Sequence, residues 1–278
     1  MKRRFRDDGI VLLKDALTEA DLAMAREAYD WSLAHPSANA CDLSQDRAAK
    51  FYQDLCNPQA LPAYRRLLDV SRAAHVAADL WDASEVWFIY EQVFLKEGGD
   101  SRRTPWHQDS SYLPVDGERI AVMWISFDAV DREHSLEFVS GSHRDVPYDG
   151  SRFDPDDDTA PLYGDGNLPR LPNIEAERDR WNIVSFAVEP GDIVVFHPAV
   201  LHGGAPTKAG NRRRTLSLRF FGDDATYVRR SAFDDSGSRG AKGEVPDGEG
   251  TIFSVLGRTL APGDPLRHPG FPRFRPRG

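Results

Sequence analysis

Apolar residues recur at helical spacing in the first third of the chain. Thr18 is suited to cap a helix, and apolar side chains then recur every three or four residues over 22–29, a spacing that predicts an amphipathic helix. Segments 44–56 and 62–82 show similar spacing and predict two further helices. We therefore expect residues 1–84 to be mostly helical.

The pattern changes to that of strands at residue 85. Short segments rich in aromatic and β-branched residues follow, each bounded by Gly, Pro, Asp or Asn. They are 85–97, 119–130, 135–142, 181–198 and 213–224. Several strands with no helical segments between them predict an antiparallel sandwich or barrel.

One long segment, 143–180, is rich in Pro, Gly and Asp and fits neither pattern. A long loop inside a compact domain usually carries function, so we interpret this segment as a lid or rim over the mouth of the barrel. The sequence thus predicts a single domain over 1–278. It has a helical part (1–84), a β core (85–222) that carries the lid, and a C-terminal extension (223–278).

The composition narrows the class of protein. The 278 residues are 40% hydrophobic and 28% charged, which is enough apolar material for a folded core. The net charge of -9 repels phosphates, so we expect neither nucleic acid nor a membrane surface as a partner. With only Cys41 and Cys56, a disulfide framework or a cysteine metal cluster is excluded. Because no apolar run reaches the roughly 20 residues of a membrane span and no signal peptide is recognised, we expect cytoplasmic residence.

The stretch TPWHQDSSYLP, from Thr104, holds a histidine and an aspartate two residues apart. Alternate side chains of a strand share one face, so His107 and Asp109 would point the same way. His202, beside two glycines, would supply a third ligand, whereas its rival His197 stands directly before a proline at a strand end. Two histidines and a carboxylate on one side of a metal leave positions open for a cosubstrate and O2, which suits non-haem Fe(II).

A polar stripe begins eleven residues after His202. In RRTLSLRFF, alternation puts Arg213, Thr215, Ser217 and Arg219 on one face and apolar side chains on the other. This arrangement is expected if the barrel holds a polar ligand and its outside packs against the N-terminal helices. An arginine fork grips a carboxylate through two parallel hydrogen bonds, so Arg213 is suited to hold the far end of a dicarboxylate bound at the metal.

Together these residues resemble the phytanoyl-CoA dioxygenase family of Fe(II)- and 2-oxoglutarate-dependent oxygenases. The resemblance covers residues 5–222 and includes WHQD, with Tyr112 five residues beyond His107. It also includes Trp124 in VMWISFD, the block EFVSGSHR, and the run EPGDIVVFHPAVLHGG followed by Arg213. Each motif alone is weak, but the set is specific.

The resemblance implies a double-stranded β-helix, a jelly-roll or cupin-like core, with the N-terminal helices packed on one sheet. It implies that Fe(2+) is bound by His107, Asp109 and His202. It implies that Arg213 holds the distal carboxylate of 2-oxoglutarate. The residues that would line the cosubstrate or substrate pocket are Lys96, Gln92, Tyr112 and Trp124.

The expected activity is that of a dioxygenase that uses O2 and 2-oxoglutarate, hydroxylates an unactivated C–H bond of a small molecule, and releases succinate and CO2. Asp109 favours hydroxylation over halogenation, because halogenating relatives carry a small residue there. The chain departs from the family at His134 and Ser135, where Asn-Gly is common, and at Gly204, where a serine is common. Two alternatives remain open: a non-catalytic cupin-like metal-binding sensor, and a zinc hydrolase that uses the same ligands.

Further arginines bear on the charge of the substrate. Arg219 lies six residues beyond Arg213, or roughly 20 Å along a strand, so both cannot hold one 2-oxoglutarate. It would meet either the substrate or an internal carboxylate such as Asp156. Arg102 and Arg103 add positive charge just before the metal strand, which favours a substrate with a carboxylate or phosphate. We expect a monomer or a homodimer.

Overall fold

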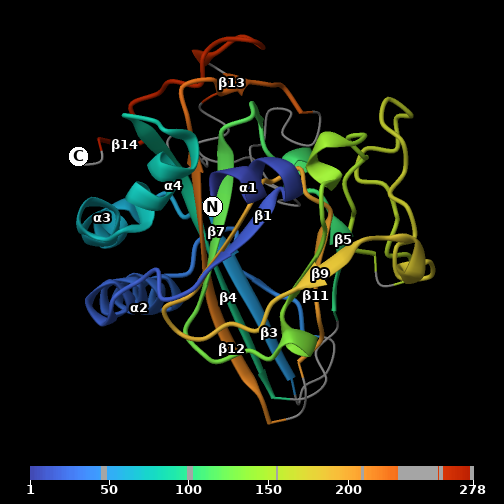
Figure 1. The fold of residues 1–278 in the computed structure, drawn as a ribbon, viewed down its shortest axis with the longest axis horizontal. Coiled ribbons are helices and arrows are strands. Elements are labelled where there is room, and N and C mark those ends of the chain that lie inside the picture. Colours follow the sequence, from blue (N-terminus) through green and yellow to red (C-terminus); the bar gives the residue numbers. More distant parts are fainter. Residues whose placement is uncertain are drawn as a thin grey trace.

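The fold consists of two antiparallel sheets that face each other, with helices covering one of them, in the computed structural model (Figure 1). The structure describes residues 1–44, 49–98, 103–154, 156–207, 210–230, 256 and 259–275. The large sheet has the order β1-β10-β7-β12-β4-β3-β2, with β14 beside β4. The small sheet has the order β5-β11-β8-β9, and β6 pairs separately with β13.

The strands that build these sheets are β1 (Ile10–Leu13), β2 (Cys41–Asp42), β3 (Ala49–Leu55), β4 (Val86–Gly98), β5 (Thr104–His107), β6 (Val115–Asp116), β7 (Ile120–Ser126), β8 (Leu136–Val139), β9 (Ile183–Ser185), β10 (Ile193–Phe196), β11 (His202–Gly204), β12 (Arg212–Phe221), β13 (Thr226–Tyr227) and β14 (Arg273–Phe274). From β4 to β12 the chain passes repeatedly between the large and the small sheet. This alternation makes the pair of sheets a double-stranded β-helix, and the prediction of that core is confirmed.

The helices cover the outer face of the large sheet. Thr18 caps α2 as predicted, in a reciprocal capping box with Asp21. Apolar side chains of the helices share one core with Leu216, Leu218 and Phe220, which lie on the outer face of β12. The described helices are α1 (Lys2–Asp8), α2 (Glu19–Ala34), α3 (Leu61–Val70), α4 (Ala73–Trp81), and the 3₁₀ turns η1 (Asp109–Tyr112), η2 (Arg132–His134), η3 (Ser142–Arg144) and η4 (Arg178–Arg180). In the described part of the chain, no helix has the length and apolarity that crossing a membrane requires.

The prediction of a helix over 44–56 was wrong. Ala49–Leu55 form the strand β3, which pairs with β4, and residues 45–48 lie outside the described part. At the start of β3 the side chains of Ala49 and Phe51 are buried while that of Lys50 is exposed. A two-residue period was therefore mistaken for a helical one.

Two details of the N-terminal part were not predicted. The segment 62–82 is helical, but the extended backbone of Ser71 divides it into α3 and α4. The elements α1 and β1 are too short to carry a clear period, yet β1 pairs with β10 at the edge of the large sheet.

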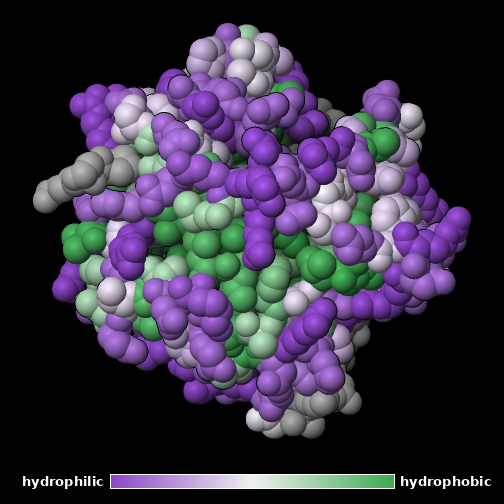
Figure 2. Space-filling model, in the orientation of Figure 1, coloured by the Kyte–Doolittle hydropathy of each residue, from purple (hydrophilic) through white to green (hydrophobic). Residues whose placement is uncertain are grey.

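Figure 2 shows apolar side chains gathered near the centre of the face seen in Figure 1, within a hydrophilic border.

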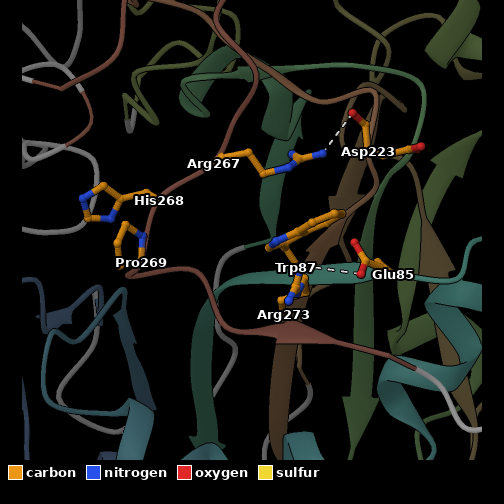
Figure 3. A pocket seen from close by; sticks show the side chains of 7 residues that line it. All are labelled: Glu85, Trp87, Asp223, Arg267, His268, Pro269 and Arg273. Carbon is orange, nitrogen blue, oxygen red and sulfur yellow. Dashed lines mark hydrogen bonds and ion pairs between the residues drawn. The ribbon is translucent and has the colours of Figure 1, made fainter.

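The described end of the chain returns to the large sheet, where β14 pairs with β4. There the guanidinium carbon of Arg267 lies 3.9 Å from the centroid of the Trp87 ring. A cavity of about 510 Å³ beside this pair is lined by Glu85, Trp87, Asp223, Arg267, His268, Pro269 and Arg273 (Figure 3). No residue predicted to bind metal, cosubstrate or substrate lines this cavity, so it is separate from the site described below.

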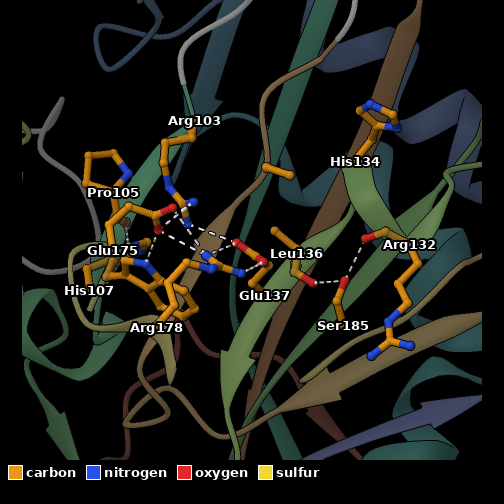
Figure 4. A network of polar contacts seen from close by, with 12 residues as sticks. Arg103, Pro105, His107, Arg132, His134, Leu136, Glu137, Glu175, Arg178 and Ser185 are labelled. Carbon is orange, nitrogen blue, oxygen red and sulfur yellow. Dashed lines mark hydrogen bonds and ion pairs between the residues drawn. The ribbon is translucent and has the colours of Figure 1, made fainter. Parts of the chain in front are cut away.

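A cluster of ion pairs fixes the predicted lid, 143–180, to the small sheet (Figure 4). Glu137 on β8 contacts Arg103 at 3.1 Å and Arg178 at 2.5 Å. Glu175 contacts the same two arginines, at 2.8 and 3.0 Å. We call Arg103, Glu137, Glu175 and Arg178 the lid clasp. Because the side chains of Arg103 and Glu137 are only 17% and 15% exposed, solvent screens this clasp less than a surface pair.

Glu175→Gln is expected to loosen the lid without loosening the barrel. The change leaves two arginines to share one carboxylate, so the lid should open locally at a lower cost, of about 1 kcal/mol. Hydrogen exchange should become faster in the lid and stay unchanged in β12. Glu177→Gln is the control, because Glu177 pairs only with the exposed Arg180 among the described ion pairs. Equal exchange in both variants would contradict a clasp.

Candidate metal centre

The strand pair β5 and β11 brings His107 and His202 together. They are direct cross-strand partners, and their ring centroids lie 4.2 Å apart. The register then shifts before Gly204 pairs with Thr104. A Cβ on Gly203 would lie 2.9 Å from the carbonyl oxygen of Thr104, so only glycine permits this close approach. The two glycines after His202 thus have the role that the sequence suggested, namely close approach.

Backbone carbonyl groups orient both imidazoles. Nδ1 of His107 lies 2.8 Å from the carbonyl oxygen of Pro105, and Nδ1 of His202 lies 2.9 Å from that of Val200. A carbonyl can only accept, so Nδ1 carries the proton and each Nε2 keeps its lone pair. Burial, and then the neighbouring His107, lower the pKa of His202 to about 3. Its ring is therefore neutral at pH 7, as a metal ligand must be.

Asp109 completes the cluster, although it does not lie on a strand. β5 ends at His107, and Asp109 is the first residue of η1, so strand alternation was the wrong reason for its orientation. Its Oδ1 nevertheless lies 3.4 Å from Nε2 of His107 and 3.8 Å from Nε2 of His202. One ligand atom from each of the three residues lies within 4.8 Å of the others. Two imidazole nitrogens and one carboxylate oxygen suit a metal ion that keeps open coordination positions.

The charge of Asp109 is compensated inside the barrel. Burial alone would oppose its ionisation, but the guanidinium of Arg219, the largest opposing influence, holds the pKa of Asp109 below its usual range. Nη2 of Arg219 lies 2.9 Å from Oδ2 of Asp109. The carboxylate is therefore ionised and available to a metal at neutral pH.

The rival ligand, His197, lies outside the cluster. Its Nδ1 accepts from the amide of Ala199, and its ring packs near Phe5 and His143. Burial, and then His143, lower its pKa to about 4. These contacts hold the end of β10 against α1 and the loop after β8, which is a packing role.

The polar stripe of β12 faces the inside of the barrel as predicted. Arg213, Thr215, Ser217 and Arg219 are all buried, while Arg214 on the opposite face pairs with Asp128. Within the described part, Arg213 donates to the carbonyl oxygens of two residues, His134 and Ala205, and to no carboxylate. Burial lowers the pKa of Arg213 only to about 10, so its guanidinium is positively charged at neutral pH.

The four residues assigned by resemblance to the pocket also lie on inner faces of the large sheet or on η1. Lys96 is the cross-strand partner of Arg213, and Gln92 and Trp124 flank Ser217 from β4 and β7. Tyr112 donates from its hydroxyl to the carbonyl oxygen of Ser151, at 2.8 Å. The structure therefore places all four around one interior, although cosubstrate contact stays a prediction.

The two arginines assigned to the substrate are engaged by protein carboxylates. Arg103 belongs to the lid clasp, and Arg219 contacts Asp109 rather than Asp156. Of the alternatives for Arg219, the internal ion pair is the one that the structure contains, and contact of either arginine with substrate stays a prediction. Arg102 lies outside the described residues.

Sequence reasoning missed two aromatic neighbours of the metal cluster. Phe153, from the predicted lid, lies edge-on to His107 at 5.2 Å between ring centroids, and its ring stacks on Tyr112. Tyr90, on β4, lies under Arg219, 4.5 Å from ring centroid to guanidinium carbon. Phe153 lies in an irregular Asp- and Pro-rich run that gives no periodic signal. Tyr90 lies on the same face of β4 as Gln92, so strand alternation could have identified it.

Replacement of the two competing histidines separates the ligand from its neighbour. His202→Ala should abolish stoichiometric binding of Fe(II) or Co(II), because it removes a neutral nitrogen from the cluster. His197→Ala should leave metal affinity unchanged and lower the melting temperature, because it removes packing beneath α1. Calorimetric metal titration of both variants checks this. Retained metal binding in His202→Ala together with its loss in His197→Ala would show that the wrong histidine was chosen.

Comparison with protein families matches residues 5–215 to phytanoyl-CoA dioxygenase (PhyH). The peroxisomal phytanoyl-CoA dioxygenase of Homo sapiens is 28% identical over 133 residues, which cover 47% of this chain and 37% of that protein. The Mus musculus protein is 22% identical over 234 residues, which cover 82% of this chain and 60% of that protein. The chain thus spans less than two thirds of the length of either relative.

Solved structures share the fold at low identity. The epimerase SnoN from nogalamycin biosynthesis is 22% identical with a TM-score of 0.67, covering 99% of this chain and 95% of its own. The carbocyclase SnoK from the same biosynthesis is 20% identical with a TM-score of 0.68, covering 98% and 94%. These likenesses support the double-stranded β-helix, and the family match spans most of the 278 residues. This chain belongs to the phytanoyl-CoA dioxygenase (PhyH) family.

Proposed function

We propose that this protein is an Fe(II)- and 2-oxoglutarate-dependent dioxygenase that hydroxylates a C–H bond of a small molecule. The observation that carries the proposal is the cluster of His107, Asp109 and His202, whose ligand atoms lie within 4.8 Å of one another. Bound Fe(II) supplies the activation of O2 that couples oxidative decarboxylation of 2-oxoglutarate, to succinate and CO2, with substrate hydroxylation. SnoN, with the same fold, was crystallised with Fe3+ and alpha ketoglutarate, which supports this cofactor pair.

Two groups of residues would hold the two ends of 2-oxoglutarate. The cluster would hold the metal end, and Arg213 with Lys96 would receive the distal carboxylate, because both are buried basic groups on adjacent strands. A planar guanidinium fixes a carboxylate by two parallel bonds. Such an anion would also relieve the repulsion between these two side chains. Gln92, Tyr112 and Trp124 bound the same interior and exclude water from it.

The substrate is proposed only as a class. Asp109 fills the metal position that halogenation would need, which favours hydroxylation. The named relatives include dioxygenases of phytanoyl-CoA, an epimerase and a carbocyclase, so membership of the family fixes no single substrate. A carboxylate or phosphate on the substrate would suit the positive charges of Arg103 and Arg219. Cytoplasmic residence and a monomeric or homodimeric state complete the proposal.

Release of succinate tests the proposal. The protein is incubated with Fe(II), ascorbate, 2-oxoglutarate and O2, over a panel of acyl-CoA, amino acid and natural-product candidates. Substrate-dependent succinate that is lost in His202→Ala supports an oxygenase. Metal binding without succinate from any candidate, or hydrolysis with Zn(II), would favour instead the sensor or the hydrolase that the same ligands allow.

Arg213→Lys should weaken 2-oxoglutarate binding without weakening metal binding. The variant keeps a positive charge but loses the planar fork, and a charge-assisted contact is worth roughly 1.5–3 kcal/mol. The Michaelis constant for 2-oxoglutarate should therefore rise about ten- to a hundredfold. Arg214→Lys, on the outer face of the same strand, is the control. An unchanged constant in Arg213→Lys would remove this arginine from the cosubstrate site.

Lys96 should make 2-oxoglutarate binding depend on pH. Burial first, and then the charges of Arg213 and Arg103, lower the pKa of Lys96 well below its usual value. A bound carboxylate would favour the ammonium form, so above the depressed pKa binding takes up a proton. Apparent affinity should therefore fall as the pH rises through that window and stay level below it. Calorimetry in buffers of different ionisation enthalpy measures the uptake, and an identical pH slope in Lys96→Met would contradict this role.

A further inference from the structure

Arg219 lies at an irregularity in the pairing of β12 with β4, and an aromatic ring lies beneath it. Along β12 and β4, Leu218 pairs with Glu91 and Phe220 pairs with Phe88, so one residue of β12 faces two residues of β4. Such a β-bulge redirects side chains, and bulges concentrate beside active sites. Tyr90 lies at this bulge on the same inner face of β4 as Gln92, and its ring centroid lies 4.5 Å from the guanidinium carbon of Arg219.

The guanidinium of Arg219 is buried but makes few hydrogen bonds. Arg219 is 4% exposed. Its Nη2 donates to Oε1 of Gln92 at 2.6 Å and to Oδ2 of Asp109 at 2.9 Å. Its Nε and Nη1 are buried and have no hydrogen-bond partner in the described part of the chain. Leaving two buried donors unbonded is costly, so a purely structural ion pair is a poor explanation of this arginine.

A second arginine–aspartate pair on the same strand shows the difference. Arg214 grips Asp128 with Nε and Nη2 and also offers its backbone amide, so both carboxylate oxygens of Asp128 are engaged. Arg219 engages one oxygen of Asp109 through one nitrogen. The bidentate arrangement is the stronger one, so the interior pair departs from the most stable geometry and leaves Oδ1 of Asp109 facing the two histidines.

We propose that Arg219 is a positioning residue that holds Oδ2 of Asp109 away from the metal, so that Asp109 offers Oδ1 alone. This inference rests on the proposed metal site. Oδ1 is the oxygen that lies 3.4 and 3.8 Å from the Nε2 atoms of His107 and His202. Without the arginine, Asp109 can turn both oxygens to the metal and close a position that 2-oxoglutarate or O2 requires. Gln92 and Tyr90 hold the guanidinium of Arg219 in place. The role of Arg219 is to keep Asp109 bound to the metal through one oxygen.

The test counts water on bound Mn(II), which fills its open positions with water and prefers octahedral coordination. Three protein ligands leave three waters, and a second oxygen from Asp109 would displace one. In Arg219→Gln the enhancement of water-proton relaxation per bound Mn(II) should therefore fall by about one third. Arg219→Lys, which keeps a donor to Oδ2, should restore most of it. Arg214→Gln is the matched control and should match the wild type while losing thermal stability.

Tyr90→Leu keeps the test valid if Arg219→Gln fails to fold. It removes the ring under the guanidinium, so relaxation should fall in the same direction by a smaller amount. Wild-type relaxation in folded, metal-loaded Arg219→Gln or Tyr90→Leu would overturn the inference. Failure of the metal site itself gives a different result: wild type and His202→Ala would then show the same weak relaxation, with no saturable Mn(II) binding in either.

Discussion

A carboxylate buried between two imidazoles is the constraint on which the interior of this protein depends. Asp109 stays ionised there because Arg219 reaches it from the opposite sheet, and backbone carbonyl groups orient both imidazoles toward it. The small sheet supplies the histidines and the large sheet supplies the arginine. The cluster therefore forms only when the two sheets face each other, which makes the fold itself the means of assembling the site.

The strand β12 links this interior to the rest of the molecule. Its inner face carries Arg213 and Arg219, while its outer face places Leu216, Leu218 and Phe220 in the core that the N-terminal helices cover. Burying arginines is unfavourable unless their neighbours compensate. The apolar outer face anchors the strand in the core, and the proposed anionic cosubstrate would compensate the cationic end of the stripe. The packing of the helices on the large sheet and the polar interior therefore both follow from the alternation of polar and apolar residues along β12.

Much of the fold and the cluster was predictable, for identifiable physical reasons. The strand segments and the inward stripe of β12 follow from a two-residue period, and His202 was distinguished from His197 by the glycines that β5 requires. The β3 error arose because Ala49–Leu55 also fits a helical spacing when read without its partner β4. The ion pair between Arg219 and Asp109 joins positions 110 residues apart, and no local pattern encodes such a contact. Phe153 was missed for the same reason, because its place beside His107 is set by the path of the segment 143–180.

An anaerobic titration of the Fe(II)-loaded protein with 2-oxoglutarate, followed by visible absorption, decides whether the cluster and Arg213 form one cosubstrate site. An α-keto acid that chelates Fe(II) gives a charge-transfer band that neither component gives alone. We expect a saturable band with one equivalent of each bound, because such binding requires both the cluster and Arg213. Tight Fe(II) binding with no such band, and no 2-oxoglutarate binding by calorimetry, would contradict this expectation.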